Sequence, residues 1–488
     1  MAIRPRLSAP ESEHQVPSAY HKVQWTSMSA RLLMNAERRM EAENYLSSGY
    51  GTRLAIESRG NGWTKLSDFA RVWQPSRLKG IQVSPNFGTP FLAATQAFDF
   101  QPIPRKWLAL ARTQDASERF VERGLILVTC SGSVGRATLA FKPHLNTLIT
   151  HDLLRIEPRD KKAHGWLYAF LRAPKARAMM TSARYGHIIK HLESSHLDTL
   201  PIPLVSKNVL DTCNSVVEQI LNLRERAYSA KLEADNYFEQ RLGRLETSDF
   251  GERGFITRAA NTILLRGQRL DAARHNPAVN LLRRHLHKNG RTVDRLSGCG
   301  FEIWVPGRYK RIPATDGVIF VDSSDLFEIN PDTSKRFADC RFGDKYRGRV
   351  QPGWLLMASS GQTYGLVGGV ILSGAFHEGK VVANHVIRII PTTSASARSG
   401  YVLVALSHPT LGRPIIKSLT FGSSVPEISP DDIADFGLVR LSERDENCIA
   451  DLAEKSAELR SQADILETQL ALDAEMILDS FISNVAAR

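Results

Sequence analysis

A duplicated phrase is the strongest constraint on this chain. GLILVTCSGSVGRATLAF at 124–141 is followed by GWLLMASSGQTYGLVGGVIL at 353–372, and their leading glycines are 229 residues apart. Further matches keep the same order: residues 88–102 with 317–331, 148–158 with 381–391, and 165–203 with 400–439. The separation grows only to 236 residues by the end of the last match. Because a few loop insertions explain that growth, the sequence predicts one fold built twice.

A second pattern follows each copy, in which apolar residues recur at alternating steps of three and four. This spacing is typical of a coiled-coil seam on a long helix. The seam positions are Cys213, Val216, Ile220, Leu223, Ala227, Ala230, Ala234 and Tyr237 in the first helix, and Ile449, Leu452, Leu459, Ala463, Leu466, Leu470 and Ile477 in the second, with breaks at Ser456 and Asp473. A narrow stripe can also hold a helix on its own domain, but its recurrence at matching places favours pairing of the two helices. A globular body precedes each helix, and the chain must return between the two helices. We therefore expect an antiparallel pair of helices with a globular body at each end.

Each copy mixes short strands with helices. The β-rich runs 125–130 and 354–359 lie among glycine turns, whereas 166–180 and 401–416 are helical in pattern. The predicted fold class is therefore α/β, as a tandem repeat of two α/β domains, each followed by a long helix, with the helices pairing as an antiparallel coiled coil. The expected boundaries are an N-terminal tail at 1–19, a first domain at 20–205, a central helix at 206–246, a second domain at 247–440 and a C-terminal helix at 441–488.

The positive charge of the chain is concentrated in two blocks. The 488 residues carry a formal net charge of +12. Residues 1–200 and 251–400 are strongly basic, residues 201–250 are near neutral, and residues 401–488 are acidic. Two basic bodies suit two contacts with a polyanion such as DNA, since clustered Lys and Arg release counterions from phosphates. A basic soluble protein without such a partner is the alternative.

Several classes of protein are disfavoured by what the sequence lacks. We find no apolar run of signal-peptide or membrane-spanning length, so we expect a cytoplasmic protein without a membrane partner. The cysteines are scattered without metal-binding spacing and are interpreted as reduced, packed thiols: Cys130, Cys213, Cys299, Cys340 and Cys448.

No motif in the sequence predicts catalysis. GAFHEGK at 374–380 fits a phosphate-binding loop, but Val381 stands where a Ser or Thr should reach magnesium, and a strand rather than a helix follows. PDTSK at 331–335 offers only one carboxylate where a nuclease needs a cluster. Nor do the copies share the histidines considered, because His151 aligns with Asn384 and His187 with Ser423. We therefore predict no catalytic residue and no metal site.

The repeated motifs resemble those of the specificity subunits of type I restriction–modification systems. The resemblance rests on the glycine phrase, on THDLLRI and NHVIRI, on WLYAFLRAP and YVLVALSHP, and on HLESSHLDTLPIPL. It covers nearly the whole chain, although IADFGLVRL replaces the expected ending of the second copy and the N-terminal tail has no counterpart.

This resemblance implies two target recognition domains that read a bipartite sequence in double-stranded DNA for a phage defence system. Two methyltransferase (modification) subunits would bind the helices, and restriction/translocase subunits would join them. Adenine methylation and cleavage would then belong to partner chains, so S-adenosylmethionine, ATP and Mg are expected on those partners and no cofactor is expected here.

Basic loop clusters are the candidate DNA contacts. Lys and Arg position such a protein on phosphates, while polar side chains read base edges. The predicted residues are Arg77, Lys79, Arg184, His187, Lys190, Arg308, Lys310, Arg311, Lys345, Arg347 and Arg349. For each of them an ordinary solvated surface charge is the alternative.

Three rival functions remain open at this point. One is a specificity subunit of a different modification or defence complex. Another is an enzyme in its own right, a stand-alone DNA nuclease or methyltransferase. The third is an adaptor that uses the coiled coil for protein partners only.

Overall fold

The computed structural model describes residues 45, 48–182, 191–245, 254–256, 258–259, 269–307, 311–339, 348–362 and 365–483. The part before the first long helix is called the N-terminal body here. Its elements are α3 (Ser48–Glu57), β1 (Trp63–Lys65), α4 (Leu66–Phe69), β2 (Ala70–Trp73), β3 (Gln82–Val83), η1 (Pro85–Phe87), β4 (Thr89–Leu92), η2 (Gln96–Phe98), β5 (Lys106–Leu108), η3 (Leu110–Arg112), α5 (Ala116–Arg119), β6 (Ile126–Thr129), β7 (Ala137–Leu139), η4 (Lys142–His144), β8 (Leu148–Ile149), β9 (Leu153–Pro158), η5 (Lys161–Ala163), α6 (His164–Arg172), α7 (Pro174–Ser182), α8 (Ser194–Asp198) and β10 (Pro201–Pro203).

The part between the two long helices is called the C-terminal body. Its elements are α11 (Ala272–His275), α12 (Pro277–Asn289), β11 (Thr292–Arg295), η7 (Ser297–Cys299), β12 (Phe301–Trp304), β13 (Pro313–Val321), η8 (Asp325–Phe327), β14 (Arg336–Phe337), β15 (Leu355–Ala358), β16 (Val370–Leu372), η11 (Ala375–His377), β17 (Val381–Val382), β18 (Val386–Pro391), α13 (Ser399–Ser407), α14 (Arg413–Ser418), α15 (Pro430–Ala434) and β19 (Gly437–Arg440). The predicted α/β class is confirmed.

The sheets of the two bodies correspond strand by strand. The largest sheet has the order β2-β9-β6-β7 in the N-terminal body and β12-β18-β15-β16 in the C-terminal body. A smaller sheet, β3-β5-β4-β8 or β14-β13-β17, and a two-stranded sheet, β1-β10 or β11-β19, complete each body. In both smaller sheets one parallel pair, β4 with β8 and β13 with β17, joins the same two repeat-related segments. The internal repeat of the sequence is therefore also a repeat of topology.

Two buried arginines explain the repeated strands that contain them. Arg155 in β9 donates hydrogen bonds to the carbonyl oxygens of Ile149 and Thr150, at 3.0 and 2.8 Å. Arg388 in β18 makes the corresponding bonds to Val382 and Ala383, at 3.0 and 3.1 Å. Each guanidinium thus satisfies carbonyl groups at a tight strand connection, and a buried charge with such partners is a structural element of the fold.

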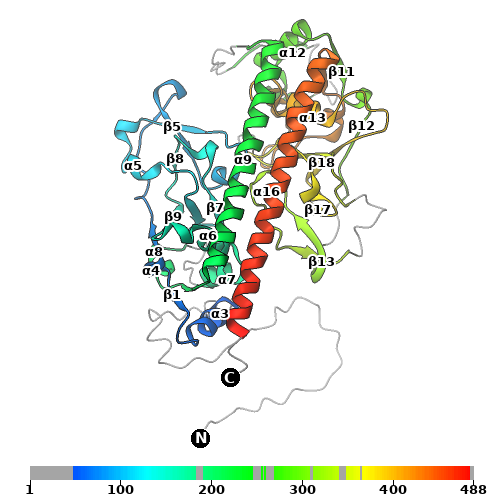
Figure 1. The fold of residues 1–488 in the computed structure, drawn as a ribbon. Helices are drawn as coiled ribbons and strands as arrows, with labels where there is room; N and C mark the ends of the chain where they lie inside the picture. The colour runs from blue at the N-terminus through cyan, green and yellow to red at the C-terminus, as the bar shows by residue number, and fades with distance from the viewer. Residues whose placement is uncertain are drawn as a thin grey trace, which may run out of the picture.

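The two long helices, α9 (Lys207–Leu242) and α16 (Glu443–Ser483), lie side by side and run in opposite directions, with one body on either side (Figure 1). Near the middle of the pair, the Ser456 hydroxyl donates to the carbonyl oxygen of Ala227 at 2.7 Å, and these residues are 229 positions apart. This hydrogen bond ties the middle of α9 directly to α16.

The bodies are not separated by the length of the helices, as a body at each end would require. They meet directly through a short antiparallel bridge at Asp99 and Glu328. The Phe100 N–H donates to Phe327 O at 3.0 Å, and the Ile329 N–H donates to Phe98 O at 2.7 Å. Since 98 and 100 align with 327 and 329 in the repeat, the same segment of each copy pairs with its own counterpart. A local two-fold axis between the copies passes through this bridge.

Candidate functional site

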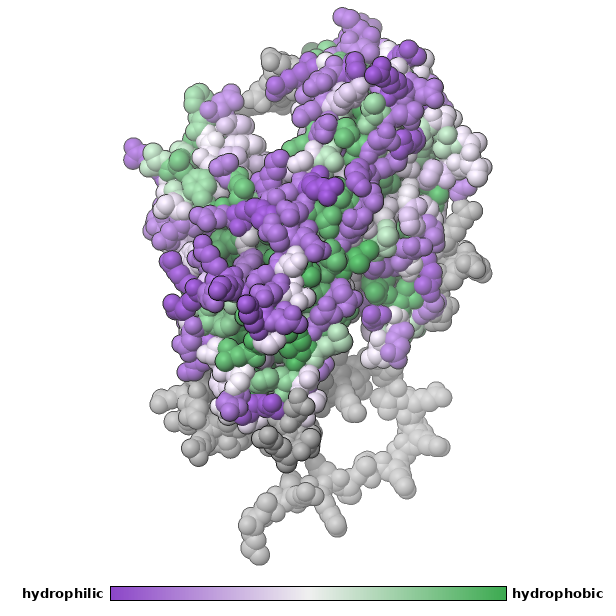
Figure 2. Space-filling model, in the orientation of Figure 1, coloured by the Kyte–Doolittle hydropathy of each residue, from purple (hydrophilic) through white to green (hydrophobic). Residues whose placement is uncertain are grey.

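The predicted seam residues lie on the long helices at half-buried or buried positions. The buried ones are Cys213, Ile220, Ala227, Ala234, Ile449, Leu459, Ala463 and Leu470, and the half-buried ones are Val216, Leu223, Ala230, Tyr237, Leu452, Leu466 and Ile477. Ser456, an expected break, is also buried, whereas Asp473 is exposed. Figure 2 shows apolar residues alternating with polar ones over the outer face of this pair.

Both helices also bury charged residues that the sequence pattern placed in solvent. These residues are Arg224, Lys231, Asp235, Arg460, Asp464 and Glu467. A helix that touches a partner helix and a globular body buries two faces, so a single narrow stripe underestimates its contacts. A signal was present in the sequence, because Lys231–Asp235 and Arg460–Asp464 are oppositely charged pairs at i, i+4 spacing.

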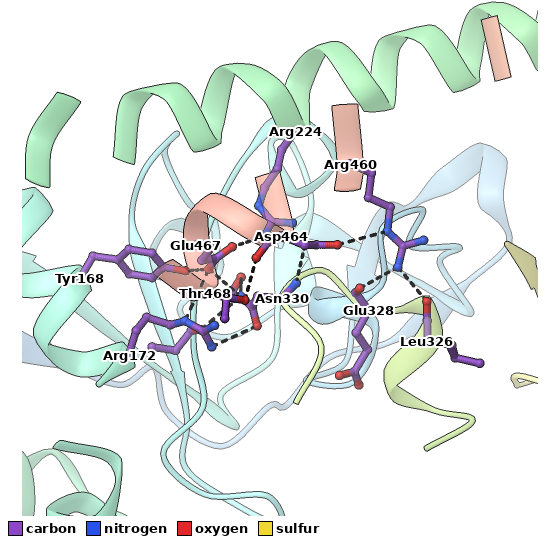
Figure 3. A network of polar contacts seen from close by, with 12 residues as sticks. Tyr168, Arg172, Arg224, Leu326, Glu328, Asn330, Arg460, Asp464, Glu467 and Thr468 are labelled. Atoms are coloured by element: carbon purple, nitrogen blue, oxygen red, sulfur yellow. Dashed lines mark hydrogen bonds and ion pairs between the residues drawn. The ribbon is translucent and has the colours of Figure 1, made fainter. Parts of the chain in front are cut away.

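The charged residues of α16 form a network that we call the polar junction (Figure 3). Arg224 of α9 forms ion pairs with Asp464, at 3.2 Å, and with Glu467. Glu467 also accepts a hydrogen bond from the Tyr168 hydroxyl of α6 and lies 3.6 Å from the Arg172 guanidinium. Burial opposes ionisation of Glu467, but Arg224 and Arg172 hold the pKa of its carboxyl below its usual range.

The polar junction also includes the C-terminal body. The Asn330 N–H donates to Asp464 at 3.1 Å, and its side-chain amide donates to Glu467 at 3.0 Å and to Thr138 of β7 at 3.2 Å. Arg460 donates to the carbonyl oxygens of Leu326 and Glu328 at 2.7 and 2.8 Å. One buried cluster therefore joins both bodies to both helices, which fixes their relative positions.

The described DNA-contact candidates lie at the smaller sheets. In the N-terminal body, Arg77 and Lys79 are exposed on the loop before β3, and the described residues give neither side chain an ion pair. In the C-terminal body, Arg311 contacts Asn384 at 3.0 Å beside β17, and Arg349 forms an ion pair with Asp339. The other candidates lie outside the described residues: Arg184, His187, Lys190, Arg308, Lys310, Lys345 and Arg347.

An exposed aromatic residue on the same small sheet was missed by the sequence analysis. The side chain of Phe87, at the end of η1, is 81% exposed, and Ile81 nearby is 57% exposed. The turn packs closely against the sheet, because a Cβ at Gly88 would lie 2.8 Å from Trp107 of β5. Lys79 and Lys106 are exposed on the adjoining chain. An exposed aromatic ring beside exposed lysines is suited to stacking on a base.

A histidine that the sequence analysis did not compare is shared by the two copies. His144 aligns with His377, and each accepts a backbone N–H through Nδ1, from Phe141 at 3.1 Å and from Gly374 at 3.3 Å. Burial lowers the pKa of His144 to about 4 and that of His377 to about 3. Both imidazoles are therefore neutral at pH 7 and close a turn of the scaffold, a role that needs no substrate.

Within the described part of the chain, no group of three or more His, Cys, Asp or Glu side chains could hold a metal ion. Over the same residues, no helix combines the length and the apolar character needed to cross a bilayer.

Comparison with known proteins gives matches only among solved structures. No family model matches the chain, and no curated protein matches it. The S subunit of a type I restriction-modification system from M. genitalium is similar at 13% identity and a TM-score of 0.29, covering 86% of this chain and 95% of that one. The HsdS subunit from Thermoanaerobacter tengcongensis is similar at 13% identity and a TM-score of 0.26, covering 86% and 96%. A chain from a structure of type I R-M complex assembly is similar at 14% identity and a TM-score of 0.26, covering 86% of this chain and 97% of that one.

Proposed function

We propose that this chain is the sequence-specific DNA-binding specificity subunit of a type I restriction–modification complex. The observation that carries the proposal is the pair of repeat-related bodies arranged about a local two-fold axis and held by one rigid helix pair. Two similar readers at a fixed distance suit a bipartite duplex target, whose half-sites are separated by a defined part of the helical repeat.

The small sheets are the proposed DNA-contacting edges. Exposed Arg77 and Lys79 would bind phosphates, and Phe87 would contact a base. Among the described residues, the repeated polar groups serve the scaffold, since Arg155 and Arg388 bond backbone carbonyl groups and His144 and His377 close a turn. Methylation of adenine and cleavage are therefore assigned to partner subunits, which would carry S-adenosylmethionine, ATP and Mg.

Partner subunits have a surface available on the helix pair. Ile465, Leu472 and Met476 of α16 are exposed apolar residues spaced by seven and four, so they share one side of the helix. Such a row, left without a covering element in a long helix, suits contact with another chain. We assign this side of α16 to a methyltransferase subunit.

The test is a map of methylated adenines in host DNA, with and without the gene for this chain. We expect a bipartite motif that disappears on deletion. Exchange of residues 20–205 for those of another specificity subunit should change one half-site and leave the other intact. The proposal fails if the methylation pattern does not change, or if the purified chain alone methylates or cleaves DNA in the presence of Mg²⁺, ATP and a methyl donor.

A further inference from the structure

A cavity lies where both bodies and both long helices meet. Its volume is about 460 Å³, and Asp99, Gln101, Leu232, Ala453, Ser407 and Arg413 are among the residues that line it. Small-molecule sites usually enclose about 300–1,000 Å³ and combine apolar walls with a few converging polar groups. The cavity has the dimensions of such a site, and the DNA-contacting edges proposed above do not include it.

The repeat explains why this space exists. On the other side of the local two-fold axis, the corresponding positions hold the larger polar residues of the polar junction. Asn330 aligns with Gln101, Arg172 with Ser407 and Tyr168 with Leu403. The three replacements all line the cavity. One copy therefore fills the junction with its own side chains, whereas the other leaves the equivalent volume open.

The open side has more positive than negative charge. Arg413 and Lys417 lie one helical turn apart on α14, and Arg105 approaches from the N-terminal body. Burial, with repulsion from Arg413 and Arg105, lowers the pKa of Lys417 to about 8. The carboxylate facing these cations is Asp99, whose pKa burial and the nearby Glu328 raise to about 7.

The remaining polar groups of the cavity lining do not neutralise this excess of positive charge. Lys231 and Asp235 of α9 pair with each other, and Arg460 is held by Asp464 and by the carbonyl oxygens of Leu326 and Glu328. The buried hydroxyl of Ser407 has no hydrogen-bond partner among the described residues. Converging cations and an unsatisfied hydroxyl are the pattern expected of a site that accepts an oxyanion.

We propose that this cavity binds a small organic anion whose phosphate or carboxylate group contacts Arg413, Lys417 and Arg105. Its apolar part would pack against Phe100, Phe327 and Leu232, which form the less polar wall. Because the lining comes from both bodies and both helices, the bound molecule supplies on this side the link that Arg224 and Asn330 supply on the other. It therefore tightens the junction between the two bodies. This proposal does not depend on DNA recognition.

The experiment is a binding titration of the full chain with phenyl phosphate, benzoate and the neutral compound phenol, by calorimetry and thermal unfolding. We expect at least one of the two anions to bind at one site per chain and to raise Tm by about 3 °C at saturating concentration. Phenol should bind at least tenfold more weakly. Inorganic phosphate, which lacks an apolar part, should also bind more weakly.

Two variants and a control localise the binding. Lys417→Gln should weaken anion binding about tenfold by removing one charged partner, and Ser407→Phe should abolish it by filling the space without changing charge. Lys65→Gln removes an exposed lysine from β1 and should leave binding unchanged. The proposal is overturned if neither anion binds the wild-type chain, if phenol binds as tightly, or if folded Ser407→Phe protein binds the anions like the wild type. DNA binding, measured on the same samples, reports separately on the proposed function.

Discussion

The two sides of the local two-fold axis contrast in how they are filled. On one side, Arg224, Asn330 and Glu467 form a buried network between the bodies. On the other side, Gln101, Ser407 and Leu403 stand at the repeat positions of Asn330, Arg172 and Tyr168, and a cavity remains. Duplication preserved the strands and their topology, whereas the junction between the copies diverged. Residues such as Arg155 and Arg388, which pack within one body, are the same in both copies. Residues at the axis face a different partner in each copy, and they differ between the copies.

Among the changes that test this contrast, removal of Arg224 should lower the stability of the folded chain the most. Arg224→Met leaves Asp464 and Glu467 buried without their main cation, which should reduce the free energy of unfolding by about 3–5 kcal/mol. Urea unfolding measures this loss. Arg123→Met is the control, because Arg123 pairs with Glu218 and Glu225 at the surface, where loss of an ion pair costs about 0–1 kcal/mol. Equal losses in the two variants would show that the polar junction does not hold the bodies together.

The shared histidines should make both bodies sensitive to acid. The folded-state pKa values of His144 and His377, about 4 and about 3, lie below the unfolded value of 6.5. Stability contributed by the neutral imidazoles is therefore complete above pH 6.5 and is lost as the pH falls toward the folded-state values. At pH 5 the loss should be about 2 kcal/mol for each histidine.

The pH dependence can be divided between the copies. Urea midpoints for wild type, His144→Gln and His377→Gln, measured between pH 7.5 and 5, should show that each variant removes part of the acid dependence. His377→Gln should be less destabilising at pH 7.5, because Nε2 of His144 bonds Ala97 O at 2.9 Å whereas the described residues offer no partner to Nε2 of His377. A wild-type slope that persists in both variants would contradict the assignment.

Asn330 and Gln101 test the same repeat position on the two sides of the axis. Asn330 has a φ of 46° and hydrogen bonds to Glu467 and Thr138. Asn330→Ala should therefore cost about 1–3 kcal/mol, since it leaves buried polar groups without partners. Gln101→Ala should change stability by less than about 0.5 kcal/mol, as is usual away from such networks. Chemical unfolding of both variants gives the comparison, and a Gln101 effect as large as that of Asn330 would remove the asymmetry.

The smallest expected effect compares the surface charges of the two bodies. Lys79→Gln should reduce the slope of log K against log salt for duplex binding by about 1, which corresponds to one lost phosphate contact. Arg349→Gln should change the slope less, because that guanidinium is paired with Asp339. Fluorescence anisotropy at several salt concentrations measures both slopes. A slope unchanged by Lys79→Gln would exclude this loop from the DNA contact.

The sequence alone predicts that one α/β fold occurs twice and that a long helix follows each copy. Those conclusions rest on local periodicity and on the matched order of motifs, which a single chain displays directly. It also pointed to the repeated strands that contain Arg155 and Arg388, although it could not show that these arginines are buried. The His144–His377 pair was visible in the alignment and was overlooked because other histidines were compared.

The contacts between the two copies could not be predicted from the sequence and became visible in the folded protein. Arg224, Asp464 and Glu467 look like solvated helix charges, because their partners are up to 243 residues away in the sequence. Whether such a charge is buried depends on elements that pack from other parts of the chain, and each buried charge must find its partner there. The cavity is likewise a property of packing, since it arises where four segments meet and the side chains of one copy are too short to fill the space.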